Sequence, residues 1–219
     1  MRAKPLRRVS PAAYNWFTCY PAELPSVRII RYPHPTLRHK SKPLRRVDAE
    51  LQKMIRQMFD LMYEEEGIGL AANQVDLPYR LFVINVQSDP AAKDEEMVFI
   101  NPVITQPKGT AEDREGCLSL PELYAPVRRP EKITISAYNA AGQEFSYQMD
   151  GLYARVVQHE YDHLDGILFI DRLTAANLLA VKEALGELEA EFCGERRRGI
   201  IPDEQQIAAR LAELEGARA

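Results

Sequence analysis

The sequence has few cysteines and no long apolar run. Only three cysteines, Cys19, Cys117 and Cys193, occur among 219 residues, so a disulfide framework cannot be completed. This usage fits a reducing compartment, where a lone cysteine is buried, reactive or bound to metal. No stretch of about 18 or more apolar residues exists, which predicts no transmembrane helix. The basic start is not followed by an apolar run, so we expect no secretory signal.

Acidic residues are scarce at the start of the chain. Residues 1 to 46 carry eleven Lys or Arg and a single acid, Glu23, whereas the rest carries 17 bases and 31 acids. A basic arm on an acidic body can indicate nucleic-acid contact or a targeting peptide. A solvated surface segment is the simpler interpretation, and we expect no specific nucleic-acid binding.

Length and composition are those of one globular domain with an appendage. The chain is 46% hydrophobic and 27% charged, which excludes disorder throughout and a coiled-coil rod. We divide it into a basic, partly disordered extension at residues 1–26, a main domain at 27–174 and a C-terminal helical region at 175–219.

The first predicted helix covers residues 48 to 65. Its apolar residues recur at helical spacing and form one stripe, with Asp48 as N-cap and Gly67 as the stop. The stripe consists of Leu51, Met54, Ile55, Met58, Phe59 and Met62.

Strand patterns follow at residues 80–86, 97–104, 132–138 and 144–149. Pro102 interrupts the second of these and indicates an edge strand or a bulge. Residues 139–142 are typical of a hairpin loop.

Helical patterns dominate the rest. A helix begins near Asp150 and places Leu152, Val156, His159 and His163 on one face, with Gly166 as C-cap. Another covers residues 177–192, a charged break covers 194–199, and a last helix begins near Pro202.

The segment Gln158-His159-Glu160-Tyr161-Asp162-His163 contains an H-E-x-x-H motif within a helical pattern. A spacing of four places both imidazoles on one side of the helix, close enough to bind one metal ion. Glu160 would lie beside the metal, where it could handle the proton of a water molecule.

A catalytic metal usually has three protein ligands and one open position. One candidate for the third ligand is Glu183 or Glu187, as in thermolysin-like zinc proteases. The other is Cys117, in the segment Glu115-Gly116-Cys117-Leu118-Ser119, which is typical of a loop or a strand end. The spacing alone favours neither candidate for the third ligand.

A third segment, Gly67-Ile68-Gly69-Leu70-Ala71-Ala72-Asn73-Gln74, follows the first helix. Its glycines would let a backbone approach a ligand closely, and Gln74 offers an amide donor. A helix stop explains Gly67 but not the whole run.

Together the three segments resemble the peptide deformylases. That family has the blocks G-x-G-L-A-A-x-Q, E-G-C-L-S and Q-H-E-x-D-H, which stand here in the same order at residues 67–74, 115–119 and 158–163. The resemblance extends from about Val27 to Leu173, and it is the resemblance that favours Cys117 over Glu183 and Glu187. It implies an α+β fold, with small mixed or antiparallel sheets around a central helix that carries H-E-x-x-H, and a C-terminal helix.

The resemblance also implies an activity and a site. The family removes the formyl group from the N-terminal formyl-methionine of new polypeptides and releases formate. By position, Cys117, His159 and His163 would hold one divalent ion, typically Fe2+, with Zn2+, Ni2+ or Co2+ able to substitute. Glu160 would be the general base and acid. Gln74 and the Leu118 backbone N–H would be the oxyanion donors.

We expect Ile68, Leu118 and Val156 to line the methionine pocket, with Gly69 permitting close approach of the peptide. The partners expected are N-formyl-methionyl nascent peptides and, through the basic arm or the C-terminal helix, the ribosome; no membrane partner is expected. The location expected is the bacterial cytoplasm, or an organelle if residues 1–26 are a transit peptide.

Besides the proposed ligands and catalytic residues, Glu115 could brace the site, with Arg155 as one partner. For Asp162 we favour an ordinary solvated charge. Two other functions compete with deformylation: a zinc endopeptidase that uses Glu183 or Glu187, and a binding module with a closed four-ligand metal site.

Overall fold

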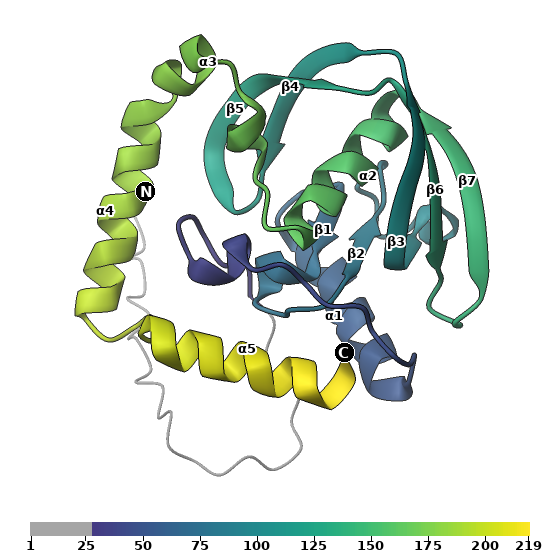
Figure 1. Ribbon diagram of the computed structural model, residues 1–219, viewed down its shortest axis with the longest axis horizontal. Helices are drawn as coiled ribbons and strands as arrows, with labels where there is room; N and C mark the ends of the chain where they lie inside the picture. The colour runs from purple at the N-terminus through teal and green to yellow at the C-terminus, as the bar shows by residue number, and fades with distance from the viewer. Residues whose placement is uncertain (1–27) are drawn as a thin grey trace, which may run out of the picture.

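The protein has an α+β fold built from two antiparallel sheets around a central helix (Figure 1). The computed structural model describes residues 28–219, so the predicted extension at 1–26 and Cys19 lie outside the described residues. The strands are β1 (Gly69–Ala71), β2 (Leu81–Ile84), β3 (Met97–Lys108), β4 (Ala111–Cys117), β5 (Leu120–Arg129), β6 (Lys132–Tyr138) and β7 (Glu144–Asp150). The helices are α1 (Ala49–Glu64), α2 (Gly151–Leu164), α3 (Ala175–Ala180), α4 (Lys182–Arg197) and α5 (Glu204–Arg218).

The larger sheet has five strands in the order β1-β2-β3-β6-β7, and β4 and β5 form a separate two-stranded ribbon. Helix α2 lies between the ribbon and the larger sheet (Figure 1). The predicted irregularity at Pro102 is a bulge, because the register of β3 on β6 shifts between Ile100 and Val103. The bulge lets β3 pair with both of its neighbours, β2 and β6, despite the proline.

Helix α1 forms where the apolar stripe predicts it. The Asp48 carboxylate accepts a hydrogen bond from the Leu51 backbone N–H at 2.9 Å and so caps the first turn. All six stripe residues are buried in one cluster with residues of β1 and β2. The sequence pattern therefore identified the core face of this helix correctly.

Helix α2 begins after Asp150, as expected, and Gly166 follows its end with a φ of 71°. Val156, His159 and His163 are buried, but Leu152 is 51% exposed. The buried face therefore comprises three of the four predicted residues. Leu152 is not part of it, because the first turn of α2 is open to solvent, where Gly151 is exposed as well.

The C-terminal helices differ from the prediction in two places. The single helix expected at 177–192 is divided at Val181 into α3 and α4. Helix α4 then runs through Gly194, the predicted break, and ends before Gly199, which has a φ of 73°. One glycine inside a helix costs only about 1 kcal/mol, which the burial of Phe192 offsets.

Helix α5 begins after Asp203, close to the expected position, and packs back on the body. Arg218 is buried and pairs with Asp48 at 2.8 Å and with Glu50, while Glu215 pairs with His39 at 2.7 Å. These contacts join the C-terminal end of the chain to α1 and to the segment before it. No helix within residues 28–219 is both long and apolar enough to span a membrane.

Candidate metal centre

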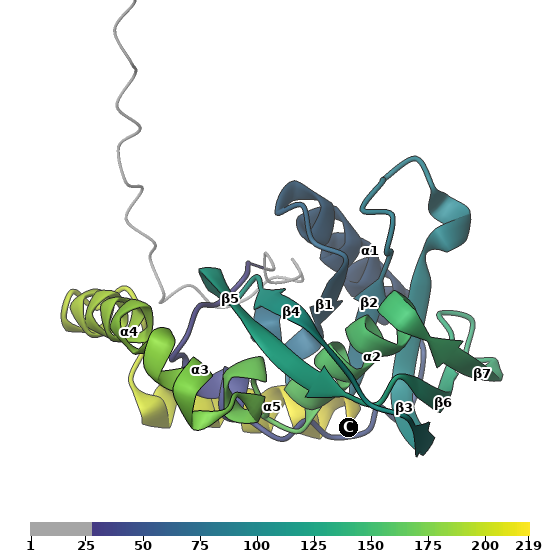
Figure 2. The same ribbon diagram turned by 90° about the horizontal axis from the view of Figure 1, so that it is seen from above.

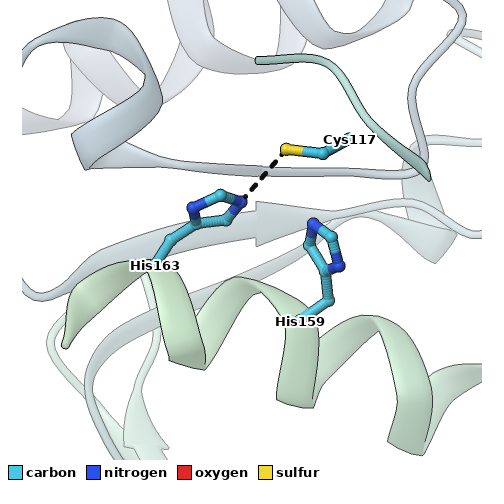
Figure 3. Close-up of side chains that lie close together, drawn as sticks. All are labelled: Cys117, His159 and His163. Atoms are coloured by element: carbon cyan, nitrogen blue, oxygen red, sulfur yellow. Dashed lines mark hydrogen bonds between the residues drawn. The ribbon is translucent and has the colours of Figure 1, made fainter. Parts of the chain in front are cut away.

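Three side chains from two elements converge beside α2. One ligand atom each from Cys117, His159 and His163 lies within 4.8 Å of the others. Figure 3 shows both imidazoles rising from the same helix toward the cysteine sulfur, with Cys117 Sγ at 3.4 Å from His163 Nε2. The predicted ligands therefore meet in space, although 42 to 46 positions separate Cys117 from the histidines.

Local structure explains why they meet. Cys117 ends β4, at the strand end that its flanking residues predicted, and a tight connection through Leu118 leads into β5. His159 and His163 are one helical turn apart on α2, and their ring centroids are 5.0 Å apart. The turn between two strands thus presents the thiol to one face of the helix.

Glu115 fixes the orientation of His159. Its Oε2 lies 3.0 Å from His159 Nδ1, which leaves Nε2 of that ring for a ligand. Glu115 is buried, and burial would raise its pKa, but His159 and Arg129 hold the pKa well below its usual range. The expected bracing role is thus supported, and Arg155 contacts Glu115 at 2.6 Å as predicted.

Arg129 is a further buried member of this network that sequence reasoning missed. It pairs with both oxygens of Glu115, at 2.6 and 2.8 Å, and with Asp162 at 2.7 Å. The sequence did indicate its burial, because Arg129 follows Leu123, Ala125 and Val127 at every second position, on the buried face of β5.

Asp162 corrects the prediction of a solvated charge. It is buried and pairs with Arg129 and Arg172, the latter at 2.5 Å between Arg172 Nε and Asp162 Oδ2. Both partners come from outside α2, so no pattern within the helix could indicate them.

Glu160 lies on the same helix with its carboxyl group buried beside Gly69. The Oε2 atom has no hydrogen-bond partner within residues 28–219. Burial raises the pKa of Glu160 to about 7. A carboxyl group with that pKa can both accept and donate a proton near neutral pH.

The glycine-rich segment supplies amide groups to the same place. Gln74 Nε2 lies 3.4 Å from Cys117 Sγ, and its Oε1 accepts the Ala71 backbone N–H at 2.8 Å. The backbone N–H groups of Ile30 and Tyr32 bind the carbonyl oxygens of Gln74 and Ser119, at 2.8 and 2.9 Å. The chain before the first helix therefore joins the two motifs.

The residues expected around the methionine side chain lie near this centre. Val156 is buried, and Ile68 and Leu118 are half-buried against the two cores that flank the site. A Cβ built on Gly67 would lie 2.7 Å from Leu118 Cδ1, so the glycine-rich and cysteine motifs pack directly together.

The alternative third ligands, Glu183 and Glu187, are on α4. Both are exposed, and α4 runs along the edge of the molecule, as the views from the front and from above agree (Figures 1 and 2). Among the described residues, only Cys117 completes a three-ligand group with the two histidines.

The donor set fits a divalent transition-metal ion. Metal–sulfur and metal–nitrogen bonds of about 2.3 and 2.1 Å at a tetrahedral angle place the two donors about 3.6 Å apart, close to the 3.4 Å between Cys117 Sγ and His163 Nε2. Burial lowers the pKa of His159, but Cys117 and Glu115 raise it to about 10, so this ring holds a proton that a bound metal ion would displace. Burial keeps the pKa of His163 well below 6.5, which leaves that ring neutral, as a ligand must be.

Comparison with known proteins matches most of the chain to one family. Residues 26–178 match the family model described as polypeptide deformylase. A peptide deformylase of Rhodopirellula baltica is 47% identical over 190 residues, which cover 85% of this chain and 92% of that protein. Peptide deformylase 1B of Arabidopsis thaliana, chloroplastic/mitochondrial, is 41% identical over 192 residues, covering 87% of this chain and 68% of that protein.

Solved structures of peptide deformylases also resemble this chain. A plant peptide deformylase is 40% identical with a TM-score of 0.76, covering 85% of this chain and 99% of that chain. A peptide deformylase from Plasmodium falciparum is 38% identical with a TM-score of 0.75, covering 76% of this chain and 98% of that chain. The expected fold class is therefore confirmed, and the chain belongs to the polypeptide deformylase family.

Proposed function

We propose that this chain uses Cys117, His159 and His163 to hold one divalent metal ion and so removes the formyl group from the N-terminal formyl-methionine of nascent polypeptides. The observation that carries the proposal is the convergence of these three donor atoms within 4.8 Å. Three protein ligands leave a coordination position open, as in catalytic sites. Membership of the deformylase family supplies the reaction, the hydrolysis of a linear amide that releases formate.

Fe2+ is the ion we propose, with Zn2+, Ni2+ or Co2+ as substitutes. A thiolate with two imidazoles suits all of these ions and not Mg2+ or Ca2+, which prefer oxygen ligands. A bound ion supplies Lewis-acid chemistry, which makes water a stronger nucleophile and stabilises charge on a carbonyl oxygen.

Glu160 is the proton carrier of the proposed mechanism. Its Oε2, which has no hydrogen-bond partner among the described residues, accepts the proton of the attacking water, and the carboxyl group then gives a proton to the leaving amine. Its pKa of about 7, raised by burial, suits both steps.

Gln74 Nε2 and the Leu118 backbone N–H are the proposed donors to the oxygen that gains negative charge when the formyl carbon becomes tetrahedral. Gln74 Nε2 faces the thiol of Cys117, so it lies beside the metal ligands. Its other amide atom is held by the Ala71 N–H, which fixes the direction of the donor.

The proposed methionine pocket is lined by Ile68, Leu118 and Val156, and Gly69 gives the peptide backbone room. Val156 belongs to one of the two cores beside the site, Ile68 packs against that same core, and Leu118 packs against the other. Ribosome contact through the basic arm or the C-terminal helix belongs to the same proposal. So does a bacterial cytoplasmic location, or an organellar one if residues 1–26 act as a transit peptide.

Metal binding by variants tests the proposed site. We expect Cys117→Ser to lose most of the affinity for Co2+, whereas the exposed Glu187→Gln variant keeps the affinity of the unmodified chain. The measurement is equilibrium dialysis under anaerobic conditions. The reverse result, with Glu187→Gln losing metal and Cys117→Ser keeping it, would assign the site to a zinc-endopeptidase arrangement.

A further inference from the structure

Arg155 stands one helical turn before His159 on α2, so Arg155, His159 and His163 follow one another at intervals of four residues along one side of the helix. This side faces the β4–β5 ribbon. The arginine thus shares its face with two of the three metal ligands, although it is not a ligand.

The Arg155 guanidinium binds both strands of the ribbon. Its Nη1 donates to Glu115 Oε1 at 2.6 Å and to the Val127 carbonyl oxygen at 3.0 Å, and its Nη2 donates to the Ala111 carbonyl oxygen at 3.0 Å. Ala111 begins β4, and Val127 lies near the end of β5. A planar group with several fixed donors is suited to hold three acceptors at once.

The ribbon needs such a tie because no other strand within residues 28–219 pairs with it. β4 and β5 pair only with each other within the described residues. A two-stranded ribbon alone is marginally stable and depends on what it packs against. Apolar residues of β5 hold one side of the ribbon on the chain around Phe169, and Cys117 packs against the same cluster. The middle of β4, Glu112, Asp113 and Arg114, is exposed and has no such support.

We propose that Arg155 is a positioning residue that holds β4, and through β4 the thiol of Cys117, against the histidines of α2; this inference rests on the proposed function. Arg129 makes the reciprocal tie, from β5 to Asp162 on α2. Arg155 acts in two ways: it sets the distance between thiol and imidazoles, and it orients Glu115, which in turn orients His159.

The test compares three variants of the full chain with Co2+ as the probe. Arg155→Met removes all three donors, and Arg155→Lys keeps the charge on a point donor that cannot span three acceptors. Arg128→Met is the matched control, because Arg128 is an exposed arginine of β5 that pairs with Glu112 at 2.8 Å within the ribbon.

We expect Arg155→Met to weaken Co2+ binding by about 10- to 100-fold and to shift the thiolate-to-cobalt absorption band, because the thiol no longer sits at its place. Arg155→Lys should weaken binding by a smaller factor, and Arg128→Met should match the unmodified chain. If Arg155→Met does not fold, a weaker affinity and shifted band in Arg155→Lys support the proposal.

Unchanged affinity and an unchanged band in the folded Arg155 variants would overturn the proposal, even if their melting temperatures fell. Failure of the proposed function gives a different result, since the unmodified chain would then bind no Co2+ at Cys117 or release no formate. The spectroscopic band separates positioning of the thiol from a general loss of stability.

Discussion

At the scale of the residue, Glu160 is the proposed carrier of the proton in deformylation. Its neighbours on α2, His159 and His163, are the proposed ligands, and its own carboxyl group is buried with one oxygen that has no hydrogen-bond partner within residues 28–219. Burial of that kind is costly for a structural side chain and is typical of a group that handles protons. The sequence predicted this role, because H-E-x-x-H on a helix fixes where the glutamate lies relative to the two histidines.

Replacing Glu160 by Gln should reduce formate release by about 10²- to 10⁴-fold while metal binding persists, since an amide cannot accept the water proton. The measurement pairs turnover of a formylated peptide with metal content of the same sample. Full activity in this variant would remove Glu160 from the mechanism.

Gly69 gives a second prediction at this scale. A Cβ built there would lie 2.5 Å from Glu160 Oε1 and 3.0 Å from its Cδ, so Gly69→Ala must displace the carboxyl group. We expect activity to fall at least 10-fold, since about an ångström of misplacement can cost 10²-fold.

Gly186→Ala is the control for this change, because a Cβ on that helical glycine meets no atom within 4 Å. It should leave activity unchanged and raise the free energy of unfolding by up to about 1 kcal/mol. Equal activity in the two alanine variants would contradict the close approach of Gly69 to Glu160.

At the scale of the element, the spacing of apolar residues predicted those helices whose burial depends on that spacing. The stripe of α1 repeats at helical spacing, so its buried face could be identified from the sequence. The β4–β5 ribbon could not be identified in this way, because β4 is rich in charged residues. The partners that make burial of Glu115 possible, Arg129 and residues of α2, are distant in the sequence. The division of the C-terminal helix at Val181 likewise has no signal in the apolar spacing.

The N-cap of α1 makes stability depend on pH. Hydrogen bonding from the Leu51 N–H, and then from Arg218, lowers the pKa of Asp48 from 3.8 to about 2. A lowered pKa means that the folded state favours the carboxylate. This contribution is therefore fully present above about pH 4 and is lost as the pH falls toward 2.

Asp48→Asn checks this prediction, since asparagine still caps a helix but cannot form the ion pair with Arg218. We expect it to lower the free energy of unfolding by about 1 kcal/mol at pH 7, and the difference from the unmodified chain to shrink as the pH falls from 4 toward 2. Urea unfolding at pH 7, 4 and 2.5 measures this; a difference that does not change with pH would exclude the carboxylate as its source.

At the scale of the whole molecule, one centre joins elements that are distant in the sequence. The ribbon provides Cys117 and α2 provides the histidines, while the segment at Ile30 and Tyr32 ties the glycine-rich motif to the cysteine motif. We propose that the catalytic domain spans residues 27–174, with the arm at 1–26 and the helical region at 175–219 as additions.

Removing residues 1–26 should therefore leave deformylation of a short peptide within about 2-fold of the full chain. The tie at Ile30 and Tyr32 remains in the shortened chain, so the site is retained. Loss of activity on a short peptide would place the arm inside the catalytic domain.

The most direct test of the central claim is formate release from formyl-Met-Ala-Ser by anaerobically purified, Fe2+-loaded protein with its metal content quantified. We expect about one ion per chain and steady formate release, with both lost in Cys117→Ser. Iron-loaded protein that releases no formate from this peptide would contradict the claim.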